Sequence, residues 1–161
     1  HELSCRGKRV ELELVGDGEE RQALLRLTLK LGIQEQVTFS GWLPIESVRL
    51  AMRNSTLLVH PSIGLGAAVP TVIKESMAVG TPVIASEVAG IPELLDLGSC
   101  GILVSPRDTK ELADAIDTML SSQDLRREYA FRARRYAEDT FDLTKNGLKL
   151  ATRLSSTTRV S

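Results

Sequence analysis

The sequence is poor in aromatic residues and cysteine and has no long apolar run. Aromatic residues make up 4% of the 161 residues, with a single tryptophan, Trp42. The two cysteines, Cys5 and Cys100, fit neither a metal-ligand spacing nor a disulfide framework, which favours a reduced, cytoplasmic setting. No apolar run approaches the roughly 20 residues that span a bilayer, and no signal-peptide pattern opens the sequence. We therefore expect neither a membrane span nor secretion, and membrane association that is at most peripheral.

Charge of one sign is also lacking. Twenty Lys and Arg face 21 Asp and Glu, for a formal net charge of −1. A balance of this kind gives no general attraction to nucleic acid, so no nucleic-acid partner is expected. With 42% hydrophobic residues, the chain has the length and composition of one ordinary globular domain.

The stretch from His60 to Pro92 reads as strand, loop, helix, strand. An apolar run at 57–59 ends in a Gly-punctuated loop, a helix opens near Pro70, and a second apolar run at 82–85 follows Gly80. In such a unit the loop lies at the carboxyl end of a parallel strand, where open α/β sheets bind their ligands. The central stretch therefore predicts a ligand site as well as a fold.

Similar alternation along the chain predicts a doubly wound, parallel, Rossmann-like α/β sheet. Helices are expected at 19–31, 44–54, 71–79, 91–97, 108–120, from Asp124 onward and at 142–154. We divide the chain into a ragged start at 1–8, one folded domain at 9–154 and a flexible tail at 155–161. The five expected strands are 10–15, 37–40, 57–60, 82–85 and 101–104.

The helix that opens near Pro70 is the predicted anion site. Proline suits the first helical position, so the free N–H groups of Thr71 and Val72 would point out of the helix start toward a diphosphate. Glu75 is the one acid on this helix, and its neighbours are expected to point elsewhere. A carboxylate that reaches back toward the helix start suits the hydroxyl groups of a sugar or a ribose.

Two further features have competing interpretations. Residues 16–18, Gly-Asp-Gly, are either a nucleotide-edge loop or a strand-to-helix turn with Asp17 as the helix N-cap, and the structural interpretation is favoured because lone glycine pairs are common. His60 has no nearby acid or second ligand in sequence, so a structural role is favoured over catalysis. The arginines that follow Asp124 alternate with acids, which favours a solvated helix face over a lipid-binding patch.

The motifs of this chain resemble a known family. Pro-Ser at 61–62 precedes Pro-x4-Glu-x-Met-Ala-x-Gly-x-Pro-Val-Ile-Ala-Ser at 70–86 and Ala-Gly-Ile-Pro-Glu at 89–93. Leu-Val-Gly-Asp-Gly at 14–18, Val-Thr-Phe-Ser-Gly at 37–41 and Gly-Ile-Leu-Val-Ser-Pro-x-Asp at 101–108 stand in the same order. Together they resemble the carboxyl-terminal, donor-binding half of family 4 retaining glycosyltransferases, which have the GT-B fold.

The resemblance implies a role for several residues. It places Glu75 on the nucleotide ribose and puts the loop after the second strand beside the base. It assigns no metal ligand and no cofactor, because the nucleotide-diphospho-sugar is the substrate. The residues expected on the base side are Gly41, Trp42 and Leu43, and those beside the donor sugar are Ala67, Ala68 and Val69. Trp42 is equally well interpreted as an ordinary packing residue.

The chain departs from the family pattern at two places. The family signature is a pair of glutamates separated by seven residues, and Ala67 stands where the first one belongs. The family's first strand, and the basic phosphate-binding loop after it, do not precede Lys8. By resemblance that strand would lie in the middle of the sheet, so we expect the gap to be filled by the partner half of the protein, by residues 1–8, or by another copy of the chain.

The expected function follows from the resemblance. The parent protein would be a hexosyltransferase that moves a sugar from a nucleotide-diphospho-sugar to an acceptor with retention, without a metal, in cell-surface polysaccharide or glycolipid synthesis. The acceptor would be held by an amino-terminal domain missing from these 161 residues, so the chain alone would be inactive. The alternatives are a non-catalytic nucleotide-binding remnant and a fragment of a GT-B nucleotide-sugar epimerase.

Overall fold

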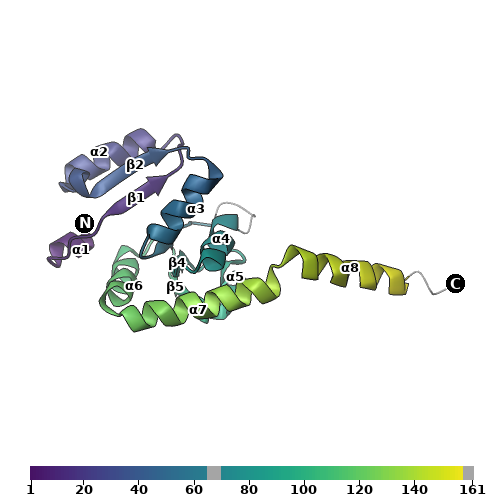
Figure 1. Ribbon diagram of the computed structural model, residues 1–161. Helices are drawn as coiled ribbons and strands as arrows, with labels where there is room; N and C mark the ends of the chain where they lie inside the picture. The colour runs from purple at the N-terminus through teal and green to yellow at the C-terminus, as the bar shows by residue number, and fades with distance from the viewer. Residues whose placement is uncertain (65–69, 158–161) are drawn as a thin grey trace.

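The computed structural model describes residues 1–64 and 70–157, and it is an α/β fold with two parallel sheets (Figure 1). The two-stranded sheet pairs β1 with β2, and the three-stranded sheet has the order β3-β4-β5. Each strand lies within two residues of its predicted range, so the predicted fold class is confirmed. The strands of the described residues are β1 (Leu12–Val15), β2 (Val37–Gly41), β3 (Leu58–His60), β4 (Val83–Ser86) and β5 (Ile102–Val104).

Helices connect the strands, and most follow the predicted ranges. The exception is the predicted helix at 91–97, which stops at Leu94 because Asp96 and Leu97 have positive φ values of 49° and 51°. The helices are α1 (Glu2–Cys5), α2 (Arg21–Leu31), α3 (Ile45–Asn54), α4 (Thr71–Val79), α5 (Ile91–Leu94), α6 (Thr109–Ser121), α7 (Gln123–Thr140) and α8 (Leu143–Thr157), with 3-10 turns η1 (Gln34–Gln36) and η2 (Asp96–Gly98).

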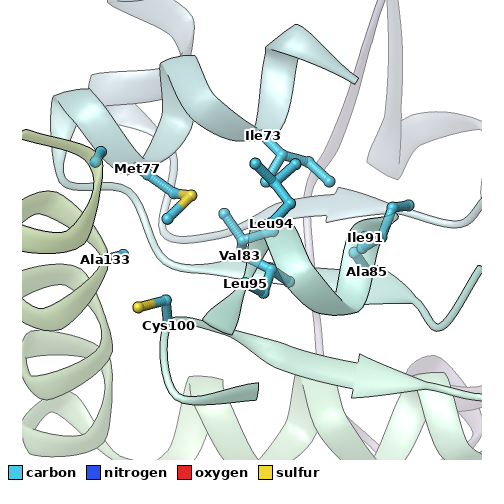
Figure 2. Packing of buried hydrophobic residues seen from close by; sticks show 10 residues of the cluster. Ile73, Met77, Val83, Ala85, Ile91, Leu94, Leu95, Cys100 and Ala133 are labelled. Atoms are coloured by element: carbon cyan, nitrogen blue, oxygen red, sulfur yellow. The ribbon is translucent and has the colours of Figure 1, made fainter. Parts of the chain in front are cut away.

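The main core surrounds the three-stranded sheet on both faces. On one face, α4, α5 and α7 cover β4: Figure 2 shows Ile73 and Met77 above Val83, with Ala133 of α7 beside them. On the other face, Ile84 of β4 packs against α6 through Met119. All four residues of β4 are buried, as expected for a central parallel strand covered by helices on both sides.

The two sheets are not hydrogen-bonded to each other. Within the described residues, β1 pairs only with β2 and β3 pairs only with β4, so one edge of each strand lacks a strand neighbour. The predicted gap in mid-sheet is therefore present in this chain. Neither face of β1 is well buried, contrary to the expected better-buried face, and Leu12 is 45% exposed.

The first residues do not fill this gap, which corrects one of the three expected fillers. Instead of a ragged start, they form α1, whose Leu3 is buried. Arg6 lies 2.6 Å from Asp114, and Lys8 donates to Asp117, so the segment is fastened to α6. A segment held as a helix against α6 cannot also serve as the central strand.

The carboxyl-terminal helices differ from the sequence expectation in length. The helix α8 continues to Thr157, into the range expected to be a flexible tail. The arginines of α7 do alternate with acids on an exposed face: Arg132 pairs with Glu128, and Arg134 with Glu138. In the part of the chain that the structure describes, no helix combines the length and apolarity needed to cross a bilayer.

Candidate functional site

The candidate site lies at the carboxyl edge of the parallel strands, where the connecting loops meet the start of α4. Two of these loops are tied together, because the N–H of Gly16 donates to the carbonyl of Gly41 at 2.7 Å. A third loop follows β3, and its Gly64 packs closely beside Val88 in the loop after β4. In open α/β sheets, this edge is where ligands bind.

The start of α4 presents unpaired backbone donors. Pro70 is the N-cap, one position earlier than the sequence predicted, so Thr71 is the first helical residue. No side chain caps this helix, and the described residues give the N–H groups of Thr71 and Val72 no acceptor. The side chain of Val72 packs against the core, while Thr71 is exposed. These donors and the helix dipole favour an anion at this point.

Glu75 is the one polar side chain of α4 left for the site, as the sequence predicted. The ammonium of Lys74 lies over the ring of Phe141, 5.3 Å from its centroid. The hydroxyl of Ser76 is buried and donates to the carbonyl of Thr81 at 3.0 Å, and Met77 is fully buried. Its three neighbours are thus committed to the core or to α7, whereas Glu75 is half-buried and has no partner among the described residues.

The helical geometry turns Glu75 toward the helix start. It stands four residues after Thr71, so both side chains lie on the same face, and Cβ atoms at this spacing are roughly 5–6 Å apart. Side chains of an α-helix also lean toward its N-terminus. The carboxylate is therefore placed one turn behind the free N–H groups, on the side they face.

The Gly-Asp-Gly turn is poorly suited to hold an anion. The N–H of Gly16 is taken by Gly41, and the N–H of Gly18 donates to the carboxylate of Asp17 at 2.8 Å. With both glycine donors engaged and a carboxylate between them, the geometry favours the structural interpretation. Asp17 is nevertheless not the N-cap of α2, because that helix begins at Arg21 with Glu20 at the cap position.

The base-side residues lie at the end of β2. Gly41 has a φ of 65°, a left-handed conformation that glycine adopts without strain, and it turns the chain out of the strand. Trp42 is 83% exposed, so its interpretation as a packing residue is wrong. Leu43 is half-buried beside it. An exposed indole at the edge of a ligand cleft offers a flat surface on which a base could stack.

The residues assigned to the donor sugar, Ala67, Ala68 and Val69, lie outside the described residues. His60 ends β3 half-buried, and burial lowers the pKa of its imidazole, so the ring is neutral at pH 7. It stays without an assigned chemical role.

One residue at this edge carried no weight in the sequence interpretation. Arg107 follows β5 with a φ of 66°, which is uncommon for a residue with a side chain, and it is exposed. The strand-breaking Pro106 before it was the signal that places it at the carboxyl edge. Across residues 1–64 and 70–157, no three His, Cys, Asp or Glu side chains gather as the ligands of a metal ion would.

Comparison with known proteins agrees with this geometry. The family model described as glycosyl transferases group 1 matches residues 2–136. The chain belongs to this family. The described α/β fold resembles the Rossmann-like halves of its GT-B members.

Two curated relatives and one solved structure illustrate the match. The chain is 31% identical over 154 residues to the alpha-D-kanosaminyltransferase of Streptomyces kanamyceticus, covering 93% of this chain and 38% of the relative. It is 35% identical over 131 residues to the N-acetyl-alpha-D-glucosaminyl L-malate synthase of Bacillus anthracis, covering 81% and 33%. Anabaena Alr3699/HepE, solved in complex with UDP-glucose, has 30% identity and a TM-score of 0.81, covering 91% and 41%. The chain thus spans about two fifths or less of each of these group 1 relatives.

Proposed function

We propose that these 161 residues are the donor-binding domain of a family 4 retaining glycosyltransferase, and that they hold a nucleotide-diphospho-sugar at the start of α4. The observation that carries the proposal is the isolation of Glu75: every neighbouring polar side chain on its helix is committed elsewhere. The free N–H groups of Thr71 and Val72 would hold the diphosphate, and Glu75 would accept hydrogen bonds from the ribose hydroxyls.

The relatives support this proposal. Alr3699/HepE, with a similar fold and 30% identity, binds UDP-glucose, UDP, and UDP together with glucose. Its likeness covers 91% of this chain, including the loops at the carboxyl edge. We extend the ligand class, a nucleotide-diphospho-sugar, to this chain, with the base beside Gly41, Trp42 and Leu43 and the donor sugar beside Ala67, Ala68 and Val69.

Transfer would need a second domain that holds the acceptor. The reaction would break the bond between the sugar and the diphosphate and pass the sugar to an acceptor hydroxyl with retention, so the leaving diphosphate gains negative charge. The α4 dipole and the N–H groups at its start would stabilise that charge without a metal. We place the parent protein in the cytoplasm, in polysaccharide or glycolipid synthesis.

A nucleotide titration followed by NMR tests the proposed site. Adding UDP or GDP to isotope-labelled protein should shift the amide signals of residues 68–73 first, with those of Leu43 and Glu75 following. The affinity should be low and should fall with added salt, because no basic residue of the described α4 start assists the helix dipole. Shifts concentrated at residues 16–18 would instead move the anion site to the Gly-Asp-Gly turn.

A second candidate function rests on Ala67. The family's glutamate at this position contacts the donor sugar, and its loss favours a remnant that binds a nucleotide without transferring sugar. An epimerase fragment is the further alternative. The coding sequence upstream separates these: an in-frame acceptor domain with a Gly-Arg and Lys-Gly loop supports the transferase, and a stop codon supports the remnant. In either case we expect the 161-residue chain alone to transfer no sugar, since both substrates must be positioned together.

A further inference from the structure

Helix α8 is the least covered element of the structure. Residues 143–155 are all exposed, and Figure 1 shows the helix projecting from the end of α7, away from both sheets. Leu143, Leu150 and Leu154 are 87%, 59% and 62% exposed. A stable soluble helix normally buries its leucines, so this face requires an explanation outside the described fold.

The direction of α8 is set by a defined corner. Asp142 caps the helix, accepting from the N–H of Lys145 at 2.7 Å, and the amide of Asn146 donates to the carbonyl of Thr140 at 2.7 Å. Phe141, between the two helices, packs edge-on against Tyr136 at 5.7 Å between centroids. These contacts hold the start of α8 against the end of α7, so its leucines are directed away from the core.

The residues of α8 separate by chemistry onto two sides. Leu143, Gly147, Leu150 and Leu154 follow the spacing i, i+4, i+7, i+11 and form one stripe, called here the leucine stripe. Lys145, Lys149 and Arg153 follow the spacing i, i+4, i+8 and lie on the opposite side. A helix with leucines on one face and only cations on the other has the pattern of helices that lie in a membrane interface.

Charge distinguishes α8 from the rest of the chain. Asp142 is the last acidic residue, so residues 143–161 contain four cations and no acid. Residues 1–142 contain 16 Lys and Arg against 21 Asp and Glu. An anionic surface would repel the body and attract α8. All three cations of α8 lie within about one Debye length, roughly 10 Å, of a surface on which the helix rests.

We propose that α8 is a membrane-surface helix that lays its leucine stripe into the interface of a bilayer containing anionic lipid. The bilayer is favoured over a protein partner because the cations are unmixed with acids along the whole helix, which suits a uniformly anionic surface. Lys145 also reaches Asp139, at 3.4 Å, but this pair is exposed and contributes little. The proposal is independent of nucleotide binding and is tested without it.

Vesicle co-sedimentation of the whole 161-residue chain tests the proposal. The chain should sediment with vesicles of phosphatidylcholine and phosphatidylglycerol, and far less with phosphatidylcholine alone. Each cation near an anionic surface strengthens binding roughly fivefold, so Lys145→Gln, Lys149→Gln and Arg153→Gln together should weaken it on the order of a hundredfold. Replacing Leu143, Leu150 and Leu154 by Ser should abolish it. Matched controls outside α8, Arg127→Gln and Leu97→Ser, should bind as the wild type does.

A fluorescence measurement reports insertion directly. In a Trp42→Phe background, Leu150→Trp should give an emission blue shift with anionic vesicles, and Lys149→Trp on the opposite side should not. Equal binding to neutral vesicles, or binding that the α8 substitutions leave unchanged, would overturn the proposal. So would concentration-dependent self-association that the three Leu→Ser changes remove, because it would show that the leucine stripe covers a second copy of the chain.

Discussion

The two sheets of this protein are built from similar strand sequences but differ sharply in burial. Every residue of β4 in the three-stranded sheet is buried, whereas β1 in the two-stranded sheet is almost wholly exposed. The difference comes from neighbours: β4 has a strand on each side and helices on both faces, while β1 has one strand neighbour. Strand sequence alone therefore does not set burial; the number of covering elements does.

Amide exchange should show the largest contrast between the two sheets. The N–H groups of β4 should exchange only by near-global unfolding, and those of β1 by local opening. A difference of about 4 kcal/mol in opening free energy corresponds to roughly a thousandfold in rate. Hydrogen exchange followed by NMR measures it. Equal protection in β1 and β4 would mean that the gap beside β1 is already filled, for example by another copy of the chain.

The same contrast should appear in the cost of removing side chains. Met77→Ala empties a fully buried position against the three-stranded sheet, and should lower the free energy of unfolding by about 2–5 kcal/mol. Leu12→Ala in β1 is the matched change in the two-stranded sheet, and should cost less than about 1 kcal/mol, because Leu12 is already 45% exposed. Urea denaturation followed by circular dichroism measures both. A larger loss for Leu12→Ala would contradict the assignment of the core.

Glu75 separates function from stability on the three-stranded side. Glu75→Gln should weaken nucleotide binding by about 1–3 kcal/mol, the range for a hydrogen bond to a charged group, without unfolding the domain. Isothermal titration calorimetry and thermal melting distinguish the two effects. Glu35→Gln, in η1 at the opposite edge of the strands, is the control and should change neither. If Glu75→Gln lowers stability and leaves binding intact, the residue is structural.

The fastening of α1 to α6 should give the smallest effect, and it depends on pH. The hydrogen bond from Lys8 holds the pKa of the Asp117 carboxyl below its ordinary value of 3.8. Because the folded-state pKa is the lower one, the stabilisation is present above about pH 3.8 and is lost as the pH falls through the folded pKa. Urea midpoints measured from pH 5 downward should therefore drop more in the wild type than in Asp117→Asn. Asp124→Asn, an exposed control, should follow the wild type.

The gap between the sheets remains the main structural question that this comparison raises. The structure removes residues 1–8 from the expected fillers, because they form α1 against α6. A partner half of the protein and another copy of the chain remain as predictions. Adding upstream residues to the chain should raise the protection of β1 toward that of β4 if the first of these is right.

The sequence by itself determined the strands, most of the helices and the isolation of Glu75. Local rules suffice for these: apolar alternation marks a strand, Pro70 and Gly80 bound α4, and helical spacing places Glu75 behind Thr71. The sequence pattern also marked the carboxyl edge as the ligand site, since that edge follows from strand order.

Only the tertiary structure decided which residues are covered. The exposure of Trp42, the engagement of the glycine amides at 16–18 and the folding of residues 2–5 into α1 depend on contacts between segments far apart in sequence. The break after α5 at Asp96 and Leu97 likewise interrupts a helix whose local pattern continues. Periodicity reports which face of an element is apolar, but burial depends on whether another element is present to pack against that face.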